Sequence, residues 1–169
     1  MPLTVRKHDL PENALLRVYR DSGAFTDCYA TEIDGRITQA AFIEAFYTTF
    51  VFKVERAILK WLVSKPSTDA QAALLASDEM DTFAAWRVEA RKDDQILLTD
   101  FRGQTRSWLM SEQLGGGDST RLYFGSAVIP AKAKKTGERR MGKSFSALLF
   151  FHKLYSKVLL SSARRRLSS

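Results

Sequence analysis

Polar and hydrophobic positions alternate along the chain between residues 24 and 33. Odd-numbered positions such as Phe25, Asp27 and Tyr29 share one face, and the segment is rich in aromatic and β-branched residues. A period of two in such a segment predicts a β-strand. The Asp-Gly pair at positions 34 and 35 predicts the turn that ends it.

A helical period replaces the alternation from Thr38 onward. Apolar residues recur there at spacings of three and four, and the pattern continues to about Val63. It predicts one long helix or two in sequence. The β-branched and aromatic run at residues 48–52 favours a kink or break. Thr68 and Gln71 then form the capping-box pattern of another short helix.

The period returns to two after Asp81 and predicts four strands connected by hairpins. Their ranges are 86–90, 96–101, 105–113 and 120–129. Both faces of the last strand are mostly apolar, which indicates a strand that is covered on two sides or central in the sheet. Pro130 ends it. A final helix is expected from about Phe145 to Arg166, with an apolar stripe wider than one sheet face covers.

The order of these elements predicts an α+β fold. A curved antiparallel sheet, in the order β-αα-ββββ-α, packs on a long C-terminal helix. Over residues 24–166 this order resembles the helix-grip fold of the START/Bet v 1-like (SRPBCC) superfamily, although four strands between the second helix and the last are fewer than usual. The resemblance implies an apolar cavity between sheet and helix that binds a small molecule or, less often, supports catalysis. A cone-shaped cystatin-like fold is the alternative.

Composition indicates one soluble domain. The chain has 169 residues, of which 45% are hydrophobic, enough for one sizeable core. We therefore expect a single domain over residues 1–169, with residues 1–23 as a lead-in lying across the body. The N-terminus lacks the apolar stretch of a secretory signal, and no segment is apolar for long enough to cross a membrane. These features predict a cytoplasmic protein.

Few residues are available for metal or nucleotide chemistry. Cys28 is the single cysteine, and there are two histidines. A closed zinc site of cysteine and histidine ligands cannot be built from this set. The glycine run at 115–117 lacks the ending of a phosphate-binding loop and is expected at a hairpin tip. We therefore expect no cofactor.

The positive charge is concentrated near the C-terminus. Residues 132–169 hold eleven lysines and arginines and one acid, a net charge of +10, so residues 1–131 carry −3 of the chain's total of +7. We expect no specific nucleic-acid binding by the body. Either the basic residues are solvated side chains flanking the last helix, or they contact an anionic membrane surface. The wide apolar stripe of that helix also allows a homodimer.

Candidate ligand-binding residues come from positions that face the expected cavity. Asp27 and Asp100 fall on apolar strand faces, where a carboxylate must be paired or have a shifted pKa. Ion pairing with nearby arginines is the structural alternative. His152 lies within the apolar stripe of the last helix and is either a proton-exchanging group or a satisfied core residue. The full set is Asp27, Tyr29, Trp86, Asp100, Trp108, Phe124, His152 and Tyr155.

Three functions are compatible with this sequence. The first is a binder of an apolar or amphipathic small molecule in the cavity that the resemblance implies. The second is a peripheral membrane or partner-binding module that uses the basic C-terminal helix. The third is a small enzyme that uses Asp27, Asp100 or His152 in the same cavity.

Overall fold

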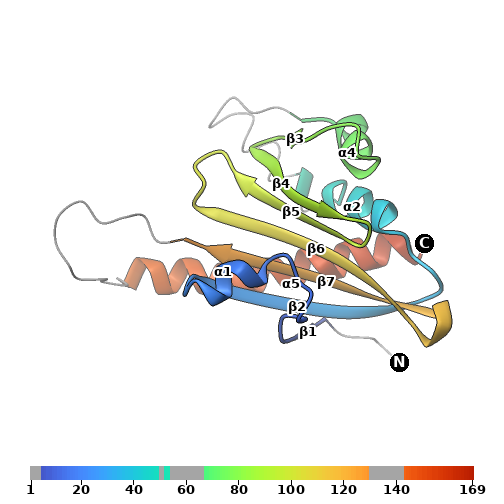
Figure 1. The fold of residues 1–169 in the computed structure, drawn as a ribbon, viewed down its shortest axis with the longest axis horizontal. Coiled ribbons are helices and arrows are strands. Elements are labelled where there is room, and N and C mark those ends of the chain that lie inside the picture. Colours follow the sequence, from blue (N-terminus) through green and yellow to red (C-terminus); the bar gives the residue numbers. More distant parts are fainter. Residues whose placement is uncertain (1–4, 50–51, 54–66, 130–142) are drawn as a thin grey trace.

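The structure is a computed structural model that describes residues 5–49, 52–53, 67–129 and 143–169; for residues 143–154 only the backbone is described. Its fold is α+β (Figure 1). The strands are β1 (Arg6–Lys7), β2 (Phe25–Asp34), β3 (Thr82–Phe83), β4 (Trp86–Lys92), β5 (Gln95–Asp100), β6 (Thr105–Leu114) and β7 (Ser119–Val128). The helices are α1 (Arg17–Asp21), α2 (Gln39–Tyr47), α4 (Asp69–Ala76) and α5 (Lys143–Leu167), with a 3-10 turn, η1 (Gly115–Gly117).

The strands form one curved antiparallel sheet in the order β1-β2-β7-β6-β5-β4-β3. The first long strand, β2, pairs along its whole length with the last, β7, and β7 pairs along its whole length with β6. The strand predicted to be central, β7, therefore lies inside the sheet and is paired on both of its edges. Its two apolar faces are explained by cover on both sides of the sheet.

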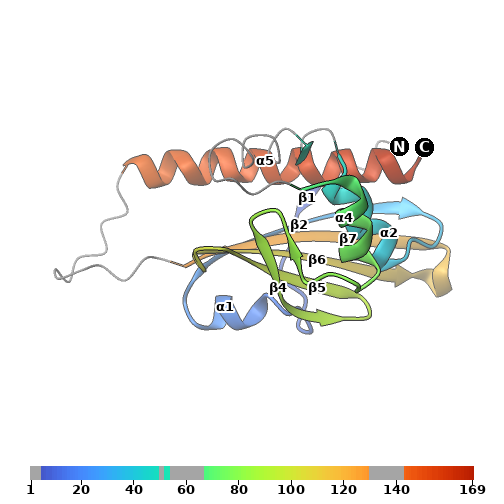
Figure 2. The ribbon, with the colours of Figure 1, turned by 90° about the horizontal axis from the view of Figure 1, so that it is seen from above.

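Helices α2, α4 and α5 cover one face of the sheet, called here the helix-facing side (Figure 2). Helix α5 packs on α2, β2 and β7, which confirms that the sheet packs on the C-terminal helix. The opposite face, called the outer side, is covered by residues 10–21, which include α1. Each side has its own hydrophobic core.

The N-terminal segment is held on the outer side by a buried glutamine. The side-chain Oε1 of Gln95 accepts hydrogen bonds from the Leu15 amide at 2.8 Å and from the Trp108 indole at 2.9 Å. Its Nε2 donates to the carbonyl of Asn13 at 3.1 Å. Because every polar atom of this buried amide has a partner, burial of Gln95 is compatible with a stable fold.

Helix α5 is held on the sheet by arginines as well as by apolar packing. Arg164 donates to the carbonyl of Glu32 on β2 at 3.0 Å, and Arg166 donates to the carbonyl of Thr48 after α2 at 3.3 Å. Two of the three consecutive arginines near the C-terminus are thus bound to the body of the protein.

Most local predictions agree with the structure. Thr38 caps α2, and the capping box of Thr68 and Gln71 is present at the start of α4. Helix α2 ends at Tyr47, next to the run where a break was predicted; the predicted continuation over residues 54–63 lies outside the described residues. Over the ranges that the structure describes, no helix combines the length and the apolarity needed to cross a membrane.

Candidate functional site

Four hydrogen-bonding side chains gather on the helix-facing side, among the buried residues of its core. Antiparallel pairing places Asp27 of β2 opposite Ser126 of β7, and Ser126 opposite Ser107 of β6. Residues directly opposite one another on paired strands point to the same face of the sheet, so the three form a line across it. Tyr47, at the end of α2, extends this line. We call Asp27, Ser126, Ser107 and Tyr47 the polar row.

The polar row is buried, and hydrogen bonds join its members in two pairs. Asp27 is only 5% exposed. One of its carboxylate oxygens accepts hydrogen bonds from the Ser126 hydroxyl at 2.5 Å and from the Ser126 amide at 3.2 Å. The hydroxyls of Tyr47 and Ser107 lie 3.4 Å apart. Hydroxyl groups both donate and accept, so this arrangement can hold a polar group of a bound molecule in more than one orientation.

Aromatic side chains surround one end of the polar row. Tyr29 and Phe124 are paired across β2 and β7, and the Phe124 ring packs against Phe46 with centroids 4.8 Å apart. Burial, with a further contribution from the Asp27 carboxylate, raises the pKa of Tyr29 to about 12. Tyr29 is therefore a neutral hydroxyl group near neutral pH, and the ammonium of Lys157 lies 5.8 Å from its ring.

Two other sequence-predicted residues, Trp86 and Asp100, lie on the next strands of the sheet, and Trp86 packs against the helix-facing core. They face each other across β4 and β5. One carboxylate oxygen of Asp100 accepts from the amides of Gln104 at 2.7 Å and Thr105 at 3.0 Å, so this carboxylate holds the turn between β5 and β6. Within the described part of the chain, the buried indole nitrogen of Trp86 has no hydrogen-bond partner.

Trp108 is separated from the other predicted residues by the sheet itself. It is completely buried on the outer side, where it packs in the core formed with the N-terminal segment. Its ring lies against Tyr123, with centroids 6.0 Å apart. Its indole hydrogen is donated to Gln95. Trp108 thus has a structural role in holding the N-terminal segment.

The two predicted residues on α5 are described to different extents. Tyr155 is half-buried and packs against the helix-facing core. The side chain of His152 lies outside the described residues. Of the eight residues, the structure therefore brings five to the helix-facing side: Asp27, Tyr29, Trp86, Phe124 and Tyr155.

Sequence reasoning missed three members of the polar row. Ser107, Ser126 and Tyr47 carry no motif, and their importance follows from pairing between strands that are far apart in sequence. The available signal was a serine at an inward position of β7, two residues after Phe124 on the same face. Inward serines on neighbouring strands indicate a polar group inside the core.

The arrangement favours binding over metal chemistry at the described residues. Over those ranges, no three histidine, cysteine or acidic side chains are grouped in a way that could hold a metal ion. Cys28, beside Asp27 in sequence but on the outer side, is buried, and burial raises the pKa of its thiol to about 12. A thiol with that pKa is a poor nucleophile near neutral pH.

No protein-family model, curated protein or solved structure matches the chain. A functional assignment therefore depends on the residues and geometry described above.

Proposed function

We propose that the protein binds an amphipathic small molecule between the helix-facing side of the sheet and α5. The molecule's polar group hydrogen-bonds to the polar row, and its apolar part packs against the aromatic side chains of Tyr29, Phe124 and Tyr155. The observation that carries the proposal is the line of a buried carboxylate and three buried hydroxyl groups across the helix-facing core, beside buried aromatic side chains. Ligand sites commonly combine apolar walls with a few convergent polar groups.

This proposal explains why polar groups are retained at these positions. Polar side chains in a core contribute less to stability than apolar residues that fill the same space, because they lose their hydrogen bonds to water on folding. A site that must orient a ligand needs such groups. The resemblance to the helix-grip fold implies a ligand in the same place, between the sheet and the last helix.

Binding is tested with ligand panels and one matched pair of variants. Native mass spectrometry and thermal-shift measurements would screen fatty acids, sterols and polyketide-like aromatics. Ser107→Ala removes one hydroxyl of the polar row, and we expect it to weaken binding of a detected ligand about ten-fold, the loss of one hydrogen bond. Ser111→Ala makes the same change at another buried serine on the same strand and face and should leave affinity unchanged.

Two outcomes would contradict the proposal. One is that no compound in the panels forms an adduct or raises the melting temperature. The other is a ligand whose affinity falls equally in Ser107→Ala and Ser111→Ala, since a specific contact with the polar row requires a difference between the two.

A further inference from the structure

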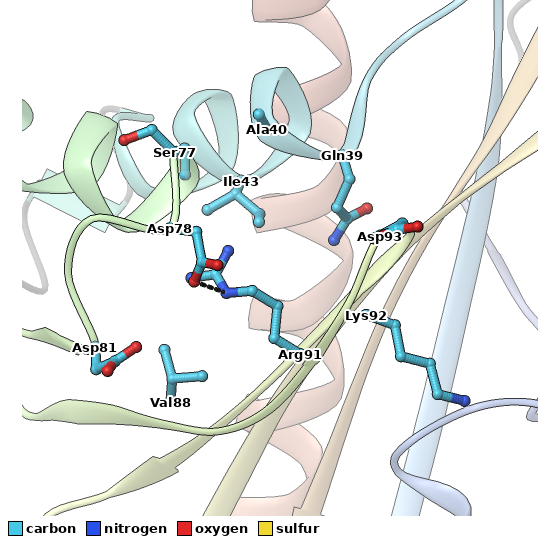
Figure 3. A pocket seen from close by; sticks show the side chains of 11 residues that line it. Gln39, Ala40, Ile43, Ser77, Asp78, Asp81, Val88, Arg91, Lys92 and Asp93 are labelled. Atoms are coloured by element: carbon cyan, nitrogen blue, oxygen red, sulfur yellow. Dashed lines mark ion pairs between the residues drawn. The ribbon is translucent and has the colours of Figure 1, made fainter.

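A groove separate from the polar row lies between α2, the end of α4 and β4 (Figure 3). Its volume is about 530 Å³. The walls include Ile43 of α2 and Val88 of β4, which are apolar, together with acidic and basic side chains. Its size is sufficient for a small organic molecule.

The basic side chains of the groove are already neutralised or directed elsewhere. Arg91 forms an ion pair with Asp78 at 2.8 Å and donates to the carbonyl of Leu75 at 2.7 Å. The ammonium of Lys92 reaches the carbonyl of Asn13, at 3.4 Å, and points away from the groove. Neither residue therefore offers an uncompensated positive charge to a bound molecule.

Two carboxylates of the groove remain uncompensated. Asp81 and Asp93 are exposed, and neither forms an ion pair with another residue in the described ranges. They stand at opposite ends of the groove in Figure 3. Helix α4 ends at the groove, and the guanidinium of Arg91 binds the carbonyl of Leu75 in its last turn.

A buried acceptor without a partner lies at the same end of the groove as Asp93. Gln39, which lines the groove and is only 8% exposed, donates through Nε2 to the carbonyl of Leu109 at 3.2 Å. Its Oε1 is buried and accepts no hydrogen bond. Leaving a buried acceptor unsatisfied costs about 1–3 kcal/mol. A donor supplied by a bound molecule would remove this cost.

We propose that this groove binds an aliphatic diamine. One ammonium group pairs with Asp81 near the end of α4, and the other pairs with Asp93 and donates the hydrogen bond that Gln39 Oε1 lacks. The methylene chain between them packs on Ile43 and Val88. The groove thus matches a diamine in charge at both ends and in apolarity at its centre, whereas an anion would meet two free carboxylates.

Isothermal titration calorimetry with putrescine and cadaverine tests this proposal. Both are expected to bind the full chain, and 1,4-butanediol, which has the same length as putrescine but no charge, is expected not to bind. The variant Asp81→Asn/Asp93→Asn should weaken diamine binding about ten-fold, as expected for the loss of two solvent-accessible ion pairs. Both side chains are exposed, so the fold should be retained.

A matched control separates the groove from the general charge of the protein. Asp9→Asn/Glu12→Gln removes two exposed carboxylates from the N-terminal segment, which lies on the outer side, and should leave diamine affinity unchanged. The proposal is overturned if diamines do not bind, if 1,4-butanediol binds as well as putrescine, or if the two double variants lose affinity equally. Ligand binding at the polar row is unaffected by any of these results.

Discussion

Gly125 is the residue at which the sheet leaves the least room for a side chain. A Cβ atom there would lie 2.9 Å from the Asp27 carbonyl oxygen, from Leu16 and from Trp108. Gly125→Ala should therefore lower the free energy of unfolding by about 1–3 kcal/mol, the usual cost of overpacking. Urea unfolding followed by circular dichroism measures this. An alanine variant as stable as the parent protein would contradict the prediction. Where a Cβ atom fits without strain, replacing glycine by alanine stabilises the fold, because alanine lowers the conformational entropy of the unfolded chain.

At the residue scale, alternation predicted which side chains share a face but not what covers that face. Trp108 and Phe124 illustrate the limit, because both sit in strands with apolar residues on two sides. The period of two assigns each to a face of its own strand. Which face lies under α5 depends on the path of the whole chain, and so Trp108 was grouped with residues that the structure places across the sheet.

At the scale of elements, the long helices and strands follow from the sequence, whereas β1, β3 and α1 do not. These contain two, two and five residues, too few to show a period. They are stabilised by distant contacts. The pairing of β1 with β2 continues in the hydrogen bond from the His8 amide to the Cys28 carbonyl. Tyr19 of α1 accepts a hydrogen bond from Arg106 and donates one to Glu89.

The hydrogen bonds from Arg164 and Arg166 predict that these two side chains stabilise the position of α5 on the sheet. Arg164→Ala/Arg166→Ala removes two hydrogen bonds to backbone carbonyls of the body, and we expect a loss of about 1 kcal/mol of unfolding free energy for each. The exposed Arg165 lies between them, and Arg165→Ala is the matched control, with no expected change. The urea midpoint of each variant gives the comparison.

If Arg165→Ala costs as much as the double variant, then general charge or helix propensity, and not the hydrogen bonds to Glu32 and Thr48, accounts for the effect. The result also tests whether these arginines are available for the alternative role of the C-terminal basic residues, contact with an anionic membrane surface. Arginines that hold α5 in place are less available to an anionic surface than solvated ones.

For the molecule as a whole, buried groups with raised pKa values predict sensitivity to alkali. Burial raises the pKa of Cys28 from 9.0 to about 12 and those of Tyr29 and Tyr123 from 10.0 to about 12. The folded protein then holds more protons than the unfolded chain above about pH 8, so folding stability decreases as pH rises from about 8 to 12. Below about pH 8 these three groups are protonated in both states, and their contribution is constant.

Spectrophotometric titration at 295 nm checks this prediction. In native protein, Tyr29 and Tyr123 should ionise mainly above pH 11, whereas in 8 M urea all five tyrosines should ionise near their ordinary pKa of about 10. Urea midpoints measured between pH 7 and pH 11 should fall over the upper part of that range. Coincident native and unfolded titration curves would show that the tyrosines are solvated in the folded state.

The whole fold was more predictable than the candidate sites. The order of the elements predicted the sheet and the C-terminal helix α5, because both consist of long segments with a clear hydrophobic period. The polar row depends on which strands become neighbours, and the partnerless oxygen of Gln39 depends on the packing of α2 against β6. Such contacts between distant residues leave no periodic trace in one sequence.

The sheet ends at both borders in strands of two residues, β1 and β3, and β1 consists of Arg6 and Lys7. Arg164 also occupies a carbonyl of β2 next to that border. A second molecule that adds a strand at the β1 border therefore meets two positively charged residues, and at the β3 border it meets a strand of only two residues. Short and charged border strands are features by which β-sheet proteins discourage edge-to-edge association into fibrils.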